Sequence, residues 1–206
     1  MVLSNGLKIL SSKPFRFTTI FTTNNLLNSA LIHHNLHFQS KTIKNKERNK
    51  TMIKILFICH GNICRSTMAQ FVFQDMVNKR GLSDQFTIDS KATSMEELGN
   101  PPHRGTVRKL SQVGVPVLPH RASQLSRNDY DKFDYIIGMD TWNMKNINRI
   151  LGGDPEGKVS KLLAWSGDGR DIADPWYTGN FDETYDDVVE GCEAFLTFLL
   201  ENGLLY

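Results

Sequence analysis

The chain has few cysteines, no long apolar run, and almost no acidic residues at its N-terminal end. It holds three cysteines among 206 residues, too few for the disulfide framework that stabilises small secreted domains. We therefore expect a reducing compartment, the cytoplasm in the first place. No apolar stretch approaches the roughly 20 residues that a transmembrane helix needs, so we expect no membrane insertion.

Acidic residues are nearly missing from the first 51 positions, where Glu47 stands alone against eight Lys or Arg residues. Residues 52–206 then hold 16 basic and 21 acidic residues. The formal net charge is therefore +7 for residues 1–51 and −5 for residues 52–206, which together give the +2 of the whole chain. The basic character therefore belongs to the N-terminal segment. We expect no nucleic-acid surface on the remainder.

The composition of residues 1–51 differs from that of the rest of the chain. This segment is rich in Ser, Thr and Asn, and it resembles an organelle transit peptide, in which case the protein would be imported. Met52 can equally be the true start, which would make the extension a mis-assigned upstream segment. We expect it to be disordered, and we interpret its histidines as incidental rather than as metal ligands. They are His33, His34 and His37.

Residues 52–206 alternate short apolar runs with amphipathic helical patterns and contain no internal repeat. This alternation predicts a single three-layer α/β domain, in which helices flank a central four-stranded parallel twisted sheet. Ligands in such folds bind beyond the carboxyl ends of the strands. The expected strands are 53–58, 86–89, 135–139 and 159–163, and the expected helices are 66–80, 106–113, 141–150 and 181–200.

The strongest chemical pattern follows the first expected strand. That strand leads to Cys59, and the chain continues His-Gly-Asn-Ile-Cys-Arg-Ser before a helical pattern begins. Gly61 and Asn62 tolerate the unusual backbone angles of a tight turn, so the N–H groups of the loop can converge on one point. Arg65 adds a planar fork of donors that suits a tetrahedral oxyanion.

These surroundings change the chemistry of the sulfur. Converging N–H dipoles, an arginine and a helix N-terminus favour the thiolate of Cys59 at neutral pH. Ser66 stands at the helix entry, where its hydroxyl can cap the helix or donate to the sulfur. The alternatives are a buried cysteine beside an unrelated arginine, or a metal site of Cys59, His60 and Cys64, which would lack a fourth ligand.

A second chemical element is the sequence Asp174-Pro-Trp-Tyr. An aryl oxygen that leaves a phosphate ester needs a proton, and a carboxylic acid can supply it and later take one from water. Pro175 restricts Asp174 to extended angles, while Trp176 and Tyr177 can flank a phenyl ring. The alternative is an ordinary Asp-Pro turn with two aromatic side chains packed on the core.

These motifs together resemble the low-molecular-weight protein tyrosine phosphatase family. The resemblance rests on CHGNICRS (59–66), IDSKATS (88–94), GNPP (99–102), FDYIIGMD (133–140) and DPWY (174–177). It covers the chain from Met52 to the C-terminus. It implies a metal-independent phosphatase without a cofactor, which hydrolyses phosphotyrosine in proteins and small aryl phosphates through a covalent phosphocysteine.

The resemblance also implies roles for single residues. Cys59 falls on the family's nucleophile, Arg65 on its oxyanion-binding arginine and Asp174 on its general acid. The implied substrate-binding residues are His60, Gly61, Asn62, Ile63, Cys64, Ser66, Trp176 and Tyr177, and the implied supporting residues are Ser90 and His120.

Three other residues have interpretations of their own. Asp140 falls on an acidic residue near the family's supporting network, and N-capping of the next helix accounts for it equally well. Cys64 matches the second cysteine of the family's oxidative switch, in which a disulfide with the nucleophile traps the oxidised sulfur. We expect Cys192 in the core.

The chain departs from the family's pattern at several positions. His60 replaces a residue that is usually small or apolar, and Thr67 stands where proline is usual. His103 follows Asn-Pro-Pro where the family generally has Asp, and Trp176 stands where Tyr is common. None of these positions carries the nucleophile, the arginine or the acid.

Three other functions are consistent with the loop. An arsenate reductase needs a downstream cysteine pair, and Cys192 alone lies downstream. A phosphoarginine phosphatase resembles members with Thr in place of Ile63, whereas an apolar Ile63 favours the aryl ester. A phosphate-binding module without turnover has no need of Asp174. The sequence does not indicate an oligomeric state.

Overall fold

The structure is a computed structural model that describes residues 52–205. The expectations for the extension, including its three histidines, lie outside the described residues. The strands are β1 (Ile53–Cys59), β2 (Phe86–Ala92), β3 (Tyr135–Gly138) and β4 (Val159–Lys161). The α-helices are α2 (Arg65–Lys79), α3 (Arg104–Gln112), α4 (Thr141–Leu151), α5 (Pro175–Thr178) and α6 (Phe181–Glu201), and the 3-10 turns are η1 (Ser83–Gln85), η2 (Arg127–Asp129) and η3 (Leu162–Ala164).

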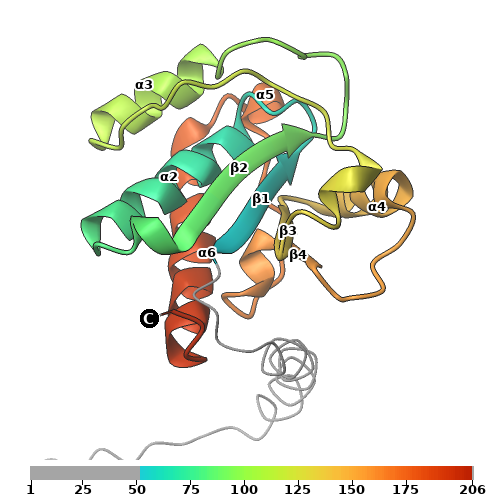
Figure 1. The fold of residues 1–206 in the computed structure, drawn as a ribbon. Coiled ribbons are helices and arrows are strands. Elements are labelled where there is room, and N and C mark those ends of the chain that lie inside the picture. Colours follow the sequence, from blue (N-terminus) through green and yellow to red (C-terminus); the bar gives the residue numbers. More distant parts are fainter. Residues whose placement is uncertain (1–51, 206) are drawn as a thin grey trace, which may run out of the picture.

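The four strands are parallel and lie in the order β2-β1-β3-β4 (Figure 1). From β1 the chain moves outward in one direction through α2 to β2, and later in the other direction from β3 through α4 to β4. Right-handed crossovers in opposite directions place α2 and α4 on opposite faces of the sheet. The strand order reverses between β1 and β3, which is where ligand sites form in such folds.

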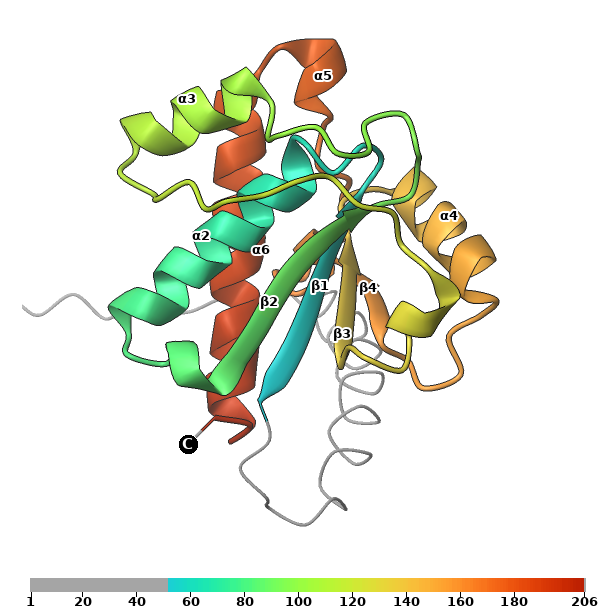
Figure 2. The same ribbon diagram turned by 45° about the horizontal axis from the view of Figure 1, so that its top comes forward.

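Both faces of the sheet are buried, as a three-layer domain requires. Side chains alternate along β1, so that Ile55 and Phe57 join the core with α2 and α6, while Leu56 and Ile58 join the core with α4. All four side chains are fully buried. The predicted fold class is confirmed, and Figure 2 shows the strands pointing toward the side of the molecule where α5 lies.

The predicted helices and strands are present; β1 and β3 end within one residue of the expected position, whereas β2 and β4 differ by more. β2 continues beyond Asp89 to Ala92, because polar side chains are tolerated on an edge strand whose backbone pairs with the end of β1. β4 ends at Lys161, because Leu162 and Leu163 turn into η3 and bury their side chains on the α6 side of the sheet. A short apolar run in the sequence does not distinguish a strand from a 3-10 turn.

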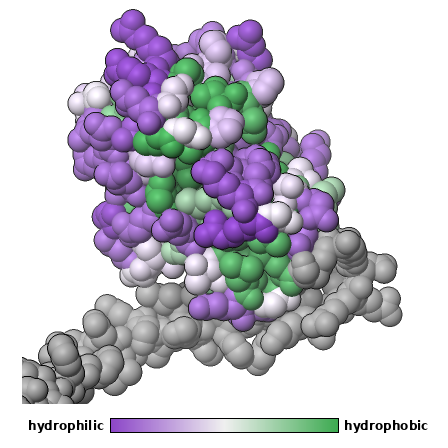
Figure 3. Space-filling model, turned by 90° about the vertical axis from the view of Figure 1, so that its left-hand side faces the viewer, coloured by the Kyte–Doolittle hydropathy of each residue, from purple (hydrophilic) through white to green (hydrophobic). Residues whose placement is uncertain are grey.

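The outer surface is mainly hydrophilic on the side that carries α2 and α3. In Figure 3 the apolar residues of this face form separate patches interrupted by hydrophilic ones. Within residues 52–205 no helix combines the length and the apolar character needed to cross a membrane. Ligand sites in such folds form at the carboxyl edge of the sheet, which here lies beyond Cys59.

Candidate active site

The loop between β1 and α2 is enclosed by the rest of the domain. Its carbonyl groups turn outward and accept hydrogen bonds from donors outside the loop. Since the carbonyls face away, the N–H groups of the loop face the side where the sulfur lies. The outward bonds run to Cys59 from Thr93 N, to His60 from Ser94 N, to Ile63 from His103 N, and to Asn62 from the ring of His120.

Two donors converge on Cys59 Sγ, which belongs to a residue that is 3% exposed. Asn62 N lies 3.3 Å and Ser66 Oγ 3.0 Å from the sulfur. Asn62 Nδ2 donates to Ser66 Oγ at 3.0 Å, which directs the hydroxyl proton of Ser66 toward the sulfur. Within residues 52–205 no side-chain hydrogen bond caps α2, so of the two roles expected for Ser66 the structure shows the contact with the sulfur and not the helix cap.

Asn62 holds the loop in shape through a left-handed backbone conformation and a saturated side chain. Its φ is 57°, the one positive value at a non-glycine position within residues 52–205. Besides Ser66, its Nδ2 donates to Ser90 Oγ at 2.8 Å, and its Oδ1 accepts from Ser123 N at 3.1 Å. Ser90 Oγ in turn donates to Gln70 Oε1 at 2.6 Å. Sequence reasoning missed Gln70 and Ser123, for which no local signal exists.

Gly61 is required for another reason than its backbone angle. Its φ lies outside the left-handed region, so the expectation of unusual angles holds for Asn62 and is wrong for Gly61. A Cβ at this position would lie 3.1 Å from Cγ of Glu97, which is closer than ordinary van der Waals contact. The glycine therefore lets the Glu97 side chain pack directly on the loop.

We expect Asn62→Ala to lower the free energy of unfolding by about 2–4 kcal/mol, since three polar groups lose their partner and alanine disfavours a positive φ. Asn62→Gly should recover roughly 1 kcal/mol of this loss, because glycine tolerates the angle. Urea denaturation of both variants measures the two contributions separately. Wild-type stability in Asn62→Gly would show that the hydrogen bonds of the side chain do not stabilise the fold.

His120 supports the same loop from outside. Its Nε2 lies 3.1 Å from the carbonyl oxygen of Asn62, and its ring meets Phe71 edge-on. Burial lowers the pKa of His120, although the Asn62 carbonyl acts in the opposite direction. The imidazole is therefore neutral at pH 7 and donates to this carbonyl from a protonated Nε2. Both predicted supporting residues, Ser90 and His120, thus contact Asn62.

Arg65 is the first residue of α2, and its side chain is 3% exposed. Nη1 donates to Asp140 Oδ2 at 2.5 Å and to the carbonyl of Ile172 at 3.0 Å, while Nη2 donates to Asp174 Oδ2 at 2.5 Å. Burial opposes the charge, but the negative charges of Cys59, Asp174 and Asp140 together raise the pKa of Arg65. Among the described residues its Nε has no hydrogen-bond partner, which leaves one buried donor for a ligand.

Asp140 caps α4, as one of its two interpretations predicts, and it also binds Arg65. Its Oδ1 accepts from Asn143 N at 2.5 Å and so caps α4, while its Oδ2 binds Arg65. β3, which neighbours β1 in the sheet, ends at Gly138 two residues earlier. Asp140 therefore reaches the guanidinium because the carboxyl ends of the two strands meet at the same edge.

Asp174 begins the one-turn helix α5, which was not predicted. Its φ of −82° and ψ of 114° are extended, as Pro175 requires. Oδ1 accepts from Trp176 N at 3.1 Å and caps the turn, and Gly179 ends it in the left-handed conformation. Trp176 is 56% and Tyr177 82% exposed, so the alternative of two aromatics packed on the core is wrong.

Cys64, Cys192 and His60 have surroundings that differ from those of Cys59. Burial, with the negative charges of Cys59 and Asp174, raises the pKa of Cys64 to about 12. The cysteines are free thiols, and the switch disulfide stays a prediction, whereas the core position of Cys192 is confirmed. His60 Nε2 lies 3.1 Å from a carboxylate oxygen of Glu96. In the described part of the chain no three His, Cys, Asp or Glu residues are grouped to hold a metal ion.

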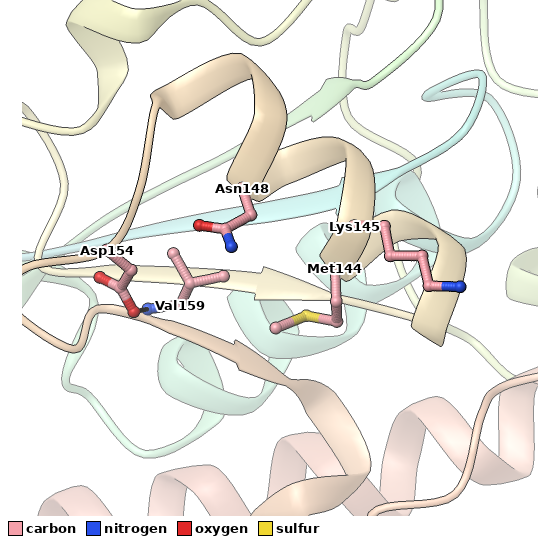
Figure 4. A pocket seen from close by; sticks show the side chains of 5 residues that line it. All are labelled: Met144, Lys145, Asn148, Asp154 and Val159. Atoms are coloured by element: carbon pink, nitrogen blue, oxygen red, sulfur yellow. Dashed lines mark hydrogen bonds between the residues drawn. The ribbon is translucent and has the colours of Figure 1, made fainter.

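A separate hollow lies beside α4, where the chain enters β4 (Figure 4). It contains none of the predicted site residues. Its carboxylate is already engaged, because Asp154 accepts from the hydroxyl of Tyr130 at 2.8 Å and from Val159 N at 3.0 Å. The hollow is lined by Met144, Lys145, Asn148, Asp154 and Val159.

A parallel α/β domain that holds a thiol, a guanidinium and a carboxylate beyond its switch point defines the class of cysteine-dependent phosphatases. The sequence profile described as low molecular weight phosphotyrosine protein phosphatase matches residues 54–203. The chain belongs to this family, as the resemblance predicted.

Relatives and solved structures agree with this assignment. The low molecular weight protein-tyrosine-phosphatase YfkJ of Bacillus subtilis is 40% identical over 147 residues, which is 70% of this chain and 94% of that protein. The low molecular weight phosphotyrosine protein phosphatase of Schizosaccharomyces pombe is 39% identical over 152 residues, 70% of this chain and 95% of that protein. The crystal structure of the Bacillus subtilis YfkJ protein superimposes with a TM-score of 0.72 at 38% identity, covering 75% of this chain and 98% of that one.

Proposed function

We propose that the protein hydrolyses phosphotyrosine in proteins through a covalent phosphocysteine on Cys59. The observation that carries this proposal is the convergence of Asn62 N and Ser66 Oγ on Cys59 Sγ, beside a buried arginine whose Nε has no hydrogen-bond partner among residues 52–205. A sulfur anion and an oxyanion site then lie next to each other. This is what nucleophilic attack on a phosphate ester requires.

In the first step Cys59 Sγ attacks phosphorus, and the bond between phosphorus and the aryl oxygen breaks. The inward N–H groups of the loop and the guanidinium of Arg65 hold the non-bridging oxygens, where negative charge is concentrated in the transition state. We propose that Asp174 protonates the departing aryl oxygen. The exposed rings of Trp176 and Tyr177 provide apolar surface for the phenyl group.

In the second step water attacks the phosphocysteine, and Asp174 takes one of its protons. The sulfur leaves as a thiolate, which the hydroxyl of Ser66 and the N–H of Asn62 stabilise. Without ligand, Asp174 is bound to Arg65. A phosphate dianion competes with the Asp174 carboxylate for that guanidinium.

Ile63 and Cys64 contribute to the proposed phosphate site through their backbone. Both side chains are buried and form a small cluster with Ala122 and Phe181. The preference for an aryl ester over phosphoarginine stays a prediction that rests on Ile63. Steady-state hydrolysis of a phosphotyrosine peptide and a phosphoarginine peptide, both in excess EDTA, tests the substrate class and the independence of metal ions together. Hydrolysis of the phosphoarginine peptide alone, or loss of activity in EDTA, would contradict the proposal.

We expect Asp174→Ala to lower kcat/KM for phosphotyrosine by roughly 10²- to 10³-fold, because the leaving oxygen loses its proton donor. The loss should be much smaller for 2,4-dinitrophenyl phosphate, whose leaving oxygen departs without a proton. The ratio of the two kcat/KM values measures general acid catalysis. Asp168→Asn, an exposed acid of the same segment that pairs with Arg170, is the matched control and should keep the ratio. Equal losses on both esters in Asp174→Ala would remove the acid from the proposal.

A further inference from the structure

His103 links the loop of the nucleophile to the turn of the acid. It caps α3, because its Nδ1 accepts from Gly105 N at 3.1 Å. Its backbone N donates to the carbonyl of Ile63 at 2.8 Å, which attaches it to the Cys59 loop. Because a backbone donor occupies Nδ1, the neutral ring carries its proton on Nε2, and both ring faces are available for packing.

The ring of His103 contacts two aromatic side chains. It stacks on Phe181, with centroids 5.3 Å apart and an interplanar angle of 5°. It meets Trp176 edge-on, with centroids 5.8 Å apart and an angle of 69°. Phe181 is itself confined, because a Cβ on Gly105 would lie 2.4 Å from its ring. The imidazole is thus stacked on Phe181 and also contacts Trp176 of the acid turn.

The acid turn needs such support. α5 has four residues, far fewer than a helix requires to be stable on its own. Its first turn holds the acid directly, because Trp176 N donates to Asp174 Oδ1. The position of the Trp176 ring therefore affects where the Asp174 carboxylate points. His103 and Trp176 are also two of the positions at which the sequence departs from the family's pattern.

We propose that His103 is a positioning residue, which holds the Asp174 turn in register with the Cys59 loop through the edge-to-face contact of its imidazole with Trp176. This inference rests on the proposed role of Asp174 as general acid. The His103 side chain then has two separate functions. The acceptor atom stabilises α3, and the ring places the acid.

Two substitutions separate these functions. His103→Asn keeps an N-capping acceptor but removes the ring, whereas His103→Phe keeps a ring but removes the acceptor. We expect His103→Asn to lower kcat/KM for phosphotyrosine roughly tenfold, because a misplaced acid loses efficiency. Its kcat/KM for 2,4-dinitrophenyl phosphate should change less than twofold. His103→Phe should melt at a lower temperature and keep the wild-type ratio of the two kcat/KM values.

The double variant with Asp174→Ala gives a second measurement. Once the acid is absent, His103→Asn should cause no further loss on phosphotyrosine, whereas a general loosening of the fold would lower activity again. A wild-type ratio in His103→Asn, equal losses on both esters, or additive losses in the double variant would each overturn the inference. If His103→Phe does not fold, His103→Asn and the double variant decide. If Asp174→Ala alone keeps the wild-type ratio, the proposed acid fails instead.

Discussion

Cys59→Ser is expected to remove turnover, with a loss in kcat/KM of at least about 10⁴-fold, as for other covalent nucleophiles. A serine hydroxyl is a far weaker acid than a thiol, so the donors that converge on position 59 do not generate an oxygen nucleophile. The loop should keep its shape, since Asn62 retains its bonds to Ser90 and Ser123. Inorganic phosphate should therefore still bind, which calorimetry measures.

Cys192→Ser is the matched control for this change. Its thiol is fully buried on α6, in the core, and its Sγ lies 3.9 Å from the carbonyl of Ala69. A hydroxyl in this position should lower the melting temperature and leave kcat/KM near that of the wild type. The two serine variants thus separate chemistry from stability. Residual turnover above 1% of the wild-type rate in Cys59→Ser would show that the sulfur is not the nucleophile.

Arg65→Lys is expected to lower kcat/KM about 10³-fold, because one ammonium nitrogen does not reproduce a planar fork. The present guanidinium contacts Asp140, Asp174 and the Ile172 carbonyl simultaneously, and it still has Nε to offer. A lysine would leave part of this set unpaired. We also expect the free energy of unfolding to fall by about 2–4 kcal/mol, because largely buried carboxylates lose a partner.

Arg80→Lys at the other end of α2 is the control for the arginine. Arg80 is exposed, and its Nη1 donates to the carbonyl of Met76 at 3.3 Å. The same chemical change there should alter stability by less than about 0.5 kcal/mol and leave the kinetics unchanged. Steady-state kinetics and urea denaturation of both variants make the comparison. Activity within tenfold of the wild type in Arg65→Lys would mean that a positive charge at this position is enough for catalysis without the planar fork.

The fold was largely predictable because its signals are local. Residues 55–59 of β1 and the whole of β3 are continuous apolar runs that a parallel sheet buries on both faces, and α6 has a long apolar stripe. The predicted ends of elements were wrong where contacts with other elements decide the local conformation. The last residues of β2 are polar, and they extend the strand because the end of β1 pairs with them. Leu162 and Leu163 look like strand residues, but α6 draws them into a 3-10 turn.

The site was predictable in its chemistry and less so in its support. Asp-Pro with a glycine four residues after the proline is a local signature of a short capped helix, so α5 could have been found. No local signal connects Asn62 with Ser90, 28 positions away, or Arg65 with Asp174, 109 positions away. The contact of His103 with Trp176 is likewise visible only after folding.

The amino-acid order by itself indicated which groups we propose for the chemistry. A cysteine at the end of a buried strand, followed by a tight turn, an arginine and a helix, leaves few ways to fold those residues. The sulfur and the N–H of Asn62 therefore come from one short segment, which Ser90, Ser123 and His120 hold from outside. Only the tertiary structure decided that Asp140 and Asp174 share the guanidinium and that an imidazole joins the two halves of the site. The reason is that each of these contacts depends on how distant strands and turns pack against one another.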